Sequence, residues 1–453
     1  MEKDYIMVQR ELELLRDLDH PNVIKFYECY QDSLSFHFVM EYCSGGELTD
    51  RVANKSSITE AETAKIMSKA FSAVNYIHEK GIVHRDIKPD NFLYASKDPD
   101  AEIKLIDFGL SRYFAPHQLL ESQVGTPYYI APDVIMGDYD YRCDYWSLGV
   151  MMFVLLAGRV PFDGPNTLEL AKEILTAQPN LKAYPWMKIS KEAKDLVSRL
   201  LEKDANKRIT AKEALQHPWI KRVQSKHTLQ NEEASQVIEN LKRFSRKQKF
   251  KKEVLDILIT QLKETELKKL KQAFKYFDKR NNGRITIADL KQVVKEQKLN
   301  ISQEQLEEII QSLGMEDTRT IGFTQFMVAA MDSKLYMTKE MLAQAFAHFD
   351  TDGSGYIDAK DLKEVMTRAA KQMSHSEIQE MIVEADTSKD GRISFEEFCN
   401  MMGVEALERD LSAQRKEIEQ SSKLIPIRKF HENPHFFQKD ALSQSIEKLR
   451  KSY

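Results

Sequence analysis

The sequence predicts an α+β body of about 220 residues followed by an all-α tail. Up to Ile220, short apolar runs typical of strands, such as Phe36 to Glu41 and Ile103 to Ile106, alternate with longer helical patterns. Residues 225–270 are charged and contain no Gly or Pro, which predicts a helical connector. From Leu270 to Met402, a unit of helix, Asp/Gly-rich loop and helix recurs four times, about every 36 residues.

Composition narrows the class of protein. A chain of 453 residues is long enough for two or three domains. Its 66 basic and 70 acidic residues leave a net charge of -4, so we expect no nucleic-acid partner. No apolar run approaches the length of a membrane helix, and we expect no membrane anchor. The four cysteines have neither metal-ligand spacing nor a disulfide pattern, which predicts a reducing, cytoplasmic location.

The segment from His84 to Asn91 has the residues that phosphoryl transfer needs. That reaction requires a carboxylate that orients the attacking hydroxyl and cations that hold the phosphates in line. We expect Asp86 to accept the hydroxyl proton and Lys88 to balance charge on the transferred group. Asp107 begins an Asp-Phe-Gly turn after a strand-like run, and with Asn91 it should bind Mg²⁺. A lone Asp-Phe-Gly is often a simple turn, so the order of the further motifs decides whether this one is functional.

Those further motifs follow in order, at Gly125 to Pro132, Asp144 to Gly149, Lys207 to Ile209 and His217 to Trp219. With them, residues 8–220 resemble a protein kinase of the calcium/calmodulin-regulated type. Lys88, two residues after Asp86, resembles the serine/threonine kinases. The resemblance implies an α+β protein-kinase fold with a mainly α C-lobe, here without the start of the N-lobe.

The same resemblance implies an ATP site. Met40 to Cys43 resembles the hinge, with Met40 as gatekeeper and the backbone of Glu41 and Cys43 facing adenine. Leu93 would lie beneath the ring, and both Met40 and Leu93 should be core residues. Glu47 resembles the acid that contacts ribose and a basic substrate residue. With Asp90, it implies protein substrates with Arg or Lys near the target Ser/Thr. A solvated surface acid is the alternative for Glu47.

Two positions concern the activation segment. Arg85 should bind an anion, for which Ser122, Thr126 and Glu121 are candidates, and we favour Glu121. Asp133 stands where the family has Glu. We therefore expect a weaker ion pair with Arg208, and not its loss.

Glu11 resembles the glutamate of the αC helix, yet no Gly-rich loop and no strand lysine precede it. We favour a shortened version of a longer kinase over a protein that works without this lid. The alternative function is a catalytically silent, calcium-sensing binding module.

The repeats of the tail match EF-hand loops, which bind calcium through positions 1, 3, 5, 7, 9 and 12. The fourth loop meets every requirement, and the third fits with a shorter acid at position 12. We expect Ca²⁺ in the fourth loop at Asp386, Ser388, Asp390, Arg392 (by its carbonyl) and Glu397. In the third loop we expect it at Asp350, Asp352, Ser354, Tyr356 (by its carbonyl) and Asp361.

The other two loops are degenerate. The first, Asp278 to Asp289, has Arg280 at position 3, where a cation replaces a ligand oxygen, so we expect weak binding or none. The second, Gly314 to Gln325, starts with Gly and ends with Gln, and should be structural.

Taken together, the chain resembles a calcium-dependent protein kinase of the plant and protist type, with its own all-α calmodulin-like domain of four EF-hands. That resemblance implies an autoinhibitory junction that contacts the EF-hands. Leu241 to Lys252 holds seven basic residues, followed by apolar residues at every fourth position, from Phe250 to Leu262. We expect this segment, with Ser245 as a pseudosubstrate, to block the substrate groove until Ca²⁺ withdraws it. A solvated connector helix is the alternative.

We therefore predict a Ca²⁺-regulated protein serine/threonine kinase that uses ATP and Mg²⁺. The expected parts are a kinase domain at 1–220, a junction at 221–265, a degenerate EF-hand pair at 266–332, a Ca²⁺-binding pair at 333–403 and an extension at 404–453.

Overall fold

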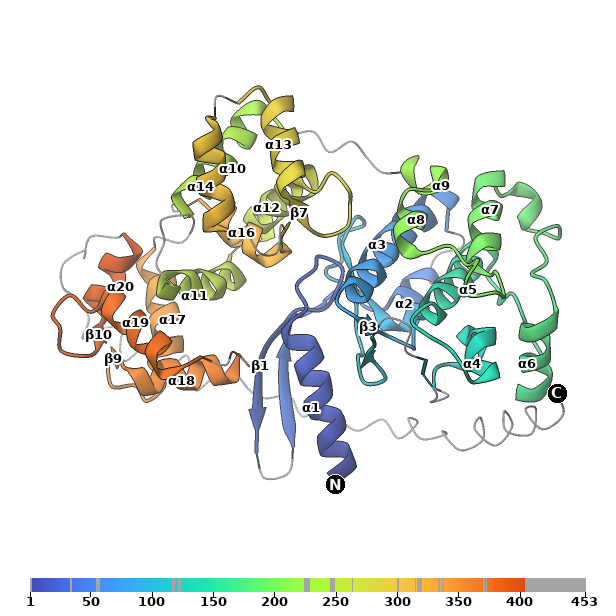
Figure 1. The fold of residues 1–453 in the computed structure, drawn as a ribbon, viewed down its shortest axis with the longest axis horizontal. Coiled ribbons are helices and arrows are strands. Elements are labelled where there is room, and N and C mark those ends of the chain that lie inside the picture. Colours follow the sequence, from blue (N-terminus) through green and yellow to red (C-terminus); the bar gives the residue numbers. More distant parts are fainter. Residues whose placement is uncertain are drawn as a thin grey trace.

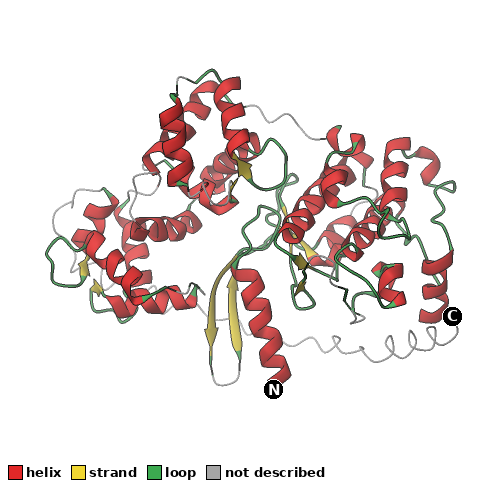
Figure 2. Ribbon diagram, viewed as in Figure 1, coloured by secondary structure: helices red, strands yellow, loops and turns green. Residues whose placement is uncertain are grey.

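The computed structural model describes residues 2–403, except 33–34, 54–57, 116–118, 121–123, 224–228, 245–248, 263, 300, 314, 316–319, 333–334, 336–337, 370 and 372. The chain forms an N-terminal body, up to residue 223, and a C-terminal domain, from residue 229 to 403 (Figure 1). Strands are few and short, and helices make up most of both parts (Figure 2).

The N-terminal body begins with α1 (Glu2–Arg16), which lies beside the hairpin of β1 (Phe26–Gln31) and β2 (Phe36–Met40) (Figure 1). The two strands are antiparallel, with Cys29 opposite Phe38 and an irregularity between Phe26 and Glu28. Among the described residues this sheet has two strands. The predicted strand from Phe36 is confirmed and ends one residue early.

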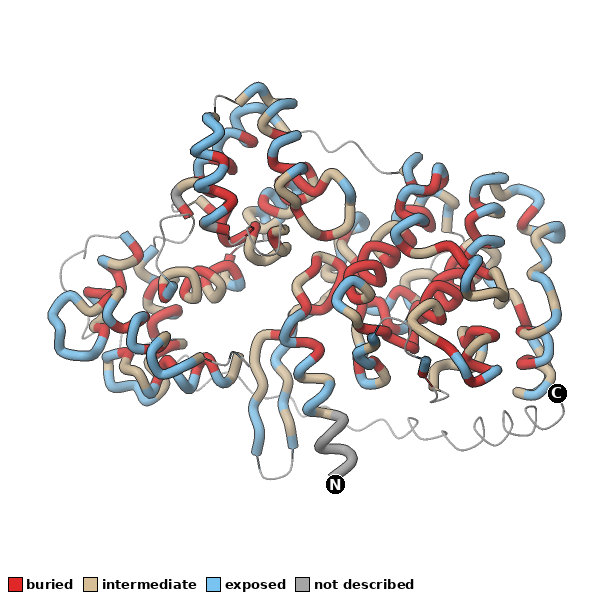
Figure 3. The backbone as a smooth tube through the Cα atoms, viewed as in Figure 1, coloured by how far each residue is buried: buried red, intermediate tan, exposed pale blue. Residues whose placement is uncertain are grey.

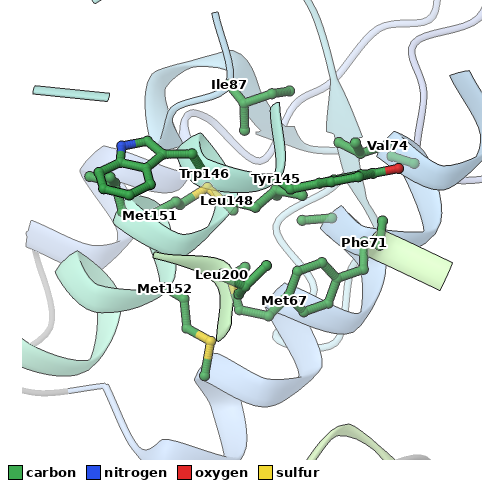
Figure 4. Close-up of a cluster of buried hydrophobic side chains, with 14 of the residues drawn as sticks. Met67, Phe71, Val74, Ile87, Tyr145, Trp146, Leu148, Met151, Met152 and Leu200 are labelled. Atoms are coloured by element: carbon green, nitrogen blue, oxygen red, sulfur yellow. The ribbon is translucent and has the colours of Figure 1, made fainter. Parts of the chain in front are cut away.

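Two long helices, α3 (Glu60–Glu79) and α5 (Cys143–Ala157), form the centre of the body. Thr59 and Glu62 start α3 with a capping box, in which each side chain satisfies a free amide of the first turn. α5 is buried on almost all sides, because its sequence is apolar around the whole helix. Met67 and Phe71 of α3 lie against side chains of α5 in the core (Figure 4).

Shorter elements complete the body. The strand pairs are β3 (Ile82–Val83) with β6 (Arg112–Tyr113) and β4 (Phe92–Tyr94) with β5 (Ile103–Leu105). The remaining helices are α2 (Leu48–Ala53), α4 (Pro132–Met136), α6 (Thr167–Thr176), α7 (Lys191–Leu200), α8 (Ala211–Leu215) and α9 (Pro218–Lys221). Single 3-10 turns lie at Pro89–Asn91, Pro127–Tyr129 and Trp186–Lys188.

The C-terminal domain contains four helix–loop–helix units, which confirms the predicted repeats. Their helices are α12 (Glu264–Phe277), α13 (Ile287–Glu296), α14 (Gln303–Ser312), α16 (Phe323–Ala330), α17 (Lys339–Phe349), α18 (Ala359–Arg368), α19 (His375–Ala385) and α20 (Phe395–Met402). Neighbouring loops pair through two-residue strands, β7 (Ile285–Thr286) with β8 (Thr320–Ile321) and β9 (Tyr356–Ile357) with β10 (Ile393–Ser394).

The connector forms α10 (Asn231–Phe244), α11 (Lys249–Leu258) and a 3-10 turn at Ile259–Gln261. The apolar positions predicted at every fourth residue, including Phe250, Val254 and Leu258, are buried in the core of the C-terminal domain. Figure 3 shows α11 with one buried side among the EF-hand helices. The alternative of a solvated connector is therefore wrong for this segment, because its apolar side is covered. Ser245 lies outside the described residues.

None of the described helices is both long and apolar enough to cross a membrane.

Candidate functional site

The catalytic loop is positioned by a buried carboxylate, Asp144, at the start of α5. Its side chain accepts hydrogen bonds from the backbone N–H groups of His84 and Arg85, both at 2.8 Å. His78 on α3 lies 2.8 Å away through Nε2. These bonds hold Arg85 with φ at +71°, a strained angle for a side-chain-bearing residue. Asp144 begins one of the motifs that follow the catalytic loop in the sequence, but the sequence alone predicted no role for this acid.

Asp86 is the centre of the site. Lys88 Nζ and Thr126 Oγ1 each lie 2.8 Å from one of its carboxylate oxygens. Asn91 Nδ2 donates to the backbone carbonyl of Asp86 at 2.8 Å and to its carboxylate at 3.1 Å. Lys88 also donates to Thr126 at 2.9 Å. The structure thus brings Asp86, Lys88 and Asn91 together, as the spacing predicted.

The electrostatics keep Asp86 ionised. Burial alone would raise its pKa, because a buried carboxylate loses hydration. Hydrogen bonds from Lys88 and Thr126 outweigh burial, so the pKa of Asp86 lies below its usual value. A charged carboxylate at neutral pH is the form that can orient a hydroxyl and accept its proton.

Asp107 and Asn91 fit a hard cation. Asp107 is exposed, has φ at +62° and accepts the N–H of Gly109 at 3.2 Å. The amide nitrogen of Asn91 is used by Asp86, which leaves the amide oxygen as a ligand. Both therefore offer the oxygen donors that Mg²⁺ prefers. Phe108 is buried against the ring of His84, which anchors the turn.

Glu11 on α1 faces this turn. Burial and the nearby charge of Asp107 raise the pKa of Glu11, although a hydrogen bond with the backbone of Phe108 partly offsets them. The helix therefore presents its glutamate toward the predicted metal turn.

The predicted adenine site lies at the end of β2. Glu47 forms an isolated antiparallel bridge with Leu93, so the predicted ribose acid and the residue beneath the ring are neighbours. Glu47 is exposed, which fits both interpretations of its role. Glu41 pairs with Lys104 at 2.7 Å, and Cys43 is half-buried. The prediction of Met40 as a core residue is wrong, since it is 41% exposed among the described residues. Leu93 is half-buried.

The activation segment meets the predictions in part. The guanidinium of Arg85 donates to the carbonyl of Leu110 and to Tyr139 Oη at 3.2 Å. Glu121 and Ser122 lie outside the described residues, so the preference for Glu121 stays a prediction. Asp133 does pair with Arg208, at 2.7 Å, although its side chain is one methylene shorter than Glu.

In the third EF-hand loop, the carboxylates of Asp350, Asp352 and Asp361 converge within 4.8 Å of one another. Ser354 lies beside them, and its amide donates to Asp350 at 2.9 Å. The carbonyl of Tyr356 accepts from Ser354 Oγ at 3.1 Å. Hard oxygen donors at this spacing are the ligands that calcium prefers.

The fourth loop has the same backbone plan, and its acids also accept hydrogen bonds from the loop itself, as Asp350 and Asp361 do in the third loop. Asp386 accepts amides of Lys389 and Gly391, and Asp390 contacts the side chain of Arg392 at 3.4 Å. Glu397 accepts the amides of Ser388 and Ser394. These bonds outweigh burial and lower the pKa of Glu397 to about 2. Binding at this loop stays a prediction.

The first loop carries its own cation. Arg280 Nε lies 3.8 Å from Asp289 at position 12. Burial raises the pKa of Asp278 at position 1 to about 7, and calcium needs this ligand deprotonated. Both observations agree with weak binding or none.

Comparison with known proteins supports the two-part plan. The protein kinase domain family matches residues 1–220, and the EF-hand domain pair family matches residues 267–331 and 339–403. A second EF-hand domain pair description matches residues 300–369.

Similar whole proteins come from protists and plants. Calcium-dependent protein kinase 3 of Plasmodium berghei is 37% identical over 87% of this chain and 72% of that relative. Calcium-dependent protein kinase 5 of Plasmodium falciparum is 36% identical over 87% of this chain and 70% of that relative. Calcium-dependent protein kinase 34 of Arabidopsis thaliana is 36% identical over 87% of this chain and 75% of that relative. The catalytic loop, the EF-hand units and these relatives together place the chain in the calcium-dependent protein kinase family, as a calcium-regulated protein serine/threonine kinase.

Proposed function

We propose that this chain transfers the γ-phosphoryl group of MgATP to Ser or Thr of proteins in basic sequence context, under control of its junction and Ca²⁺. The observation that carries the proposal is the ionised Asp86, held by Lys88, Thr126 and Asn91 around one carboxylate.

The chemistry follows from this geometry. Asp86 orients the substrate hydroxyl and accepts its proton, while Lys88 balances charge on the transferred group. Asn91 and Asp107 would hold Mg²⁺, which neutralises charge on the phosphates when bound. The hinge residues Glu41 and Cys43 would hold adenine through their backbone. This site needs Asp144 beneath it, because Asp144 fixes the backbone of the loop.

A basic substrate is supported by two exposed acids: Glu47, which forms a bridge with Leu93, and Asp90, which adjoins Asn91 in the catalytic loop. An Arg upstream of the target Ser would pair with one of them. A peptide with that Arg replaced by Ala should be a poorer substrate, with the loss mainly in KM. Equal kcat/KM for the two peptides would contradict this preference.

The regulatory proposal rests on α11. Its apolar side lies in the core of the C-terminal domain, and the amide of Phe250 donates to Glu384 at 3.1 Å. We propose that this is the released arrangement and that at rest the junction, with Ser245, occupies the substrate groove. Ca²⁺ in the third and fourth loops would favour the released arrangement. The proposed parts are those predicted, with the junction at 221–265 between the kinase domain and the EF-hand pairs.

The test is peptide phosphorylation with MgATP, in Ca²⁺ and in EGTA. We expect Ca²⁺ to raise the rate and Asp86→Ala to abolish it. A chain that ends at Gln224 should be active without Ca²⁺. Equal rates for the parent and Asp86→Ala would remove the kinase proposal and favour the calcium-sensing binding module.

A further inference from the structure

The degenerate EF-hand pair lies directly on the N-terminal body. The contact centres on three residues of the body, which we call the docking seat: Asp19 and His20, between α1 and β1, and Tyr76 of α3. In Figure 1 this part of the body lies beside β7 and α16 of the C-terminal domain. The two degenerate EF-hand loops are the parts that touch the seat.

The second loop binds Asp19. The amide of Thr324 donates to both carboxylate oxygens of Asp19, at 3.1 and 3.0 Å, and its hydroxyl donates at 2.5 Å. Lys25 of the body lies 3.6 Å from the same carboxylate. A Cβ at Gly322 would meet Asp19 at 2.6 Å, so only glycine allows this approach. Asp19 is half-buried, and hydrogen bonds to a charged acceptor are stronger than those between neutral groups.

The first loop covers His20. A Cβ added at Gly283, at position 6, would lie 1.9 Å from the ring of His20. His20 itself is fixed, since Nδ1 accepts the amide of Asn22 at 2.9 Å and Nε2 lies 3.0 Å from Ser72. Position 7 of the loop, Arg284, places its guanidinium 5.0 Å from the centre of the Tyr76 ring.

Charge pairs flank the seat. Lys275 of α12 pairs with Glu102 of the body, and Lys268 pairs with Asp98 at 3.2 Å. The second EF-hand pair, in contrast, meets the hairpin through His348, 3.3 Å from Glu28, and through Arg368 above the ring of Tyr30. The larger set of polar contacts thus belongs to the first pair.

The first loop needs no ion to keep this shape. Asp278 accepts the amides of Asn282 and Gly283, at 3.2 and 2.7 Å, which closes the turn. Asp289 caps α13 by accepting from Thr286, and Arg280 adds a positive charge beside it. Asp350 of the third loop accepts the equivalent amides of Ser354 and Gly355, so the feature that distinguishes the first loop is the positive charge of Arg280 beside Asp289.

We propose that the first EF-hand pair is a calcium-independent docking module, whose partner is the seat on the N-terminal body, and that calcium acts on the second pair alone. The docking does not depend on whether the chain phosphorylates substrates, so it can be tested without activity.

The test is hydrogen–deuterium exchange of the full chain, in EGTA and in Ca²⁺. Peptides over 15–24 and 278–289 should exchange equally in both conditions. Peptides over 350–361 should slow in Ca²⁺, which shows that calcium is bound. Asp19→Ala should speed exchange at 278–289 by about tenfold or more in both conditions, because bonds to a charged acceptor are lost. Glu28→Ala, which removes an acid that faces the second pair, is the matched control and should leave 278–289 unchanged.

A second variant changes the other side of the contact. Gly283→Ala should speed exchange at 15–24 in EGTA through the clash with His20. Gly391→Ala is its control, because it has the same loop position and a similar φ, +83° against +75°, and an added Cβ would meet no described atom within 4 Å. If Asp19→Ala does not fold, the exchange measured for Gly283→Ala tests the proposal. Slowing of exchange at 15–24 and 278–289 by Ca²⁺ would overturn the proposal, and so would unchanged exchange in both variants.

Discussion

Phe250 is one of the buried side chains by which the C-terminal domain holds the junction. It is 0% exposed, and its ring lies 5.2 Å from that of Phe349 and 6.1 Å from that of Phe398. Replacing a buried Phe with Ala removes these contacts and leaves a cavity, which costs about 3–5 kcal/mol. At about 1.4 kcal/mol per factor of ten, α11 should open roughly a hundred to several thousand times more often.

The measurement is native-state hydrogen exchange of the α11 amides in Ca²⁺, for the parent and Phe250→Ala. Ile257→Ala is the matched control, because Ile257 lies on the same helix but is half-buried, so its loss of protection should stay within about tenfold. The same two variants should differ in Ca²⁺-stimulated activity. A fall in protection for Phe250→Ala no larger than that for Ile257→Ala would refute the anchoring role.

Three further changes test other parts of the molecule. Asp86→Asn should lower kcat by about 10²- to 10⁴-fold with little change in the melting temperature, and a retained kcat would exclude Asp86 as the base. Arg280→Asp restores an oxygen at position 3 and should add one Ca²⁺ per chain in calorimetric titration, whereas Arg280→Met, which only removes the cation, should not. Burial opposes ionisation of Glu102, but Lys69 and Lys275 lower its pKa to about 2. The stability that Glu102 contributes is therefore present above its unfolded pKa and lost as pH falls toward 2. Melting temperatures of the parent should drop more steeply than those of Glu102→Gln between pH 5 and 3, and parallel curves would contradict this.

The catalytic loop could be predicted because its parts lie in one short segment. Asp86, Lys88 and Asn91 are fixed by local spacing, and the structure joins them. The role of Asp144 could not be predicted, because it depends on a contact across 60 residues with His84. Burial of Phe250 followed from its helical period, which depends only on neighbours along the chain.

Predictions that needed tertiary context were incomplete. Met40 was expected in the core because a hinge residue is normally covered, yet the face of the hairpin that carries it is open among the described residues. The contact between Asp19 and Thr324 joins positions 305 residues apart, and each is an ordinary surface residue in the sequence. The sequence of a degenerate loop shows which calcium ligands are missing, but only the packed structure shows which residues the loop contacts.

The burial of α10 and α11 in the C-terminal core determines how the chain can be divided. A recombinant calcium-binding fragment that starts at residue 266 would lack Phe250, Val254 and Leu258 and would leave their apolar binding surface open to water. Such a fragment should self-associate or capture any amphipathic helix of suitable length. A fragment that starts before Asn231 supplies its own helix. The junction, proposed as the regulatory segment, is therefore also part of the core of the calcium-binding domain.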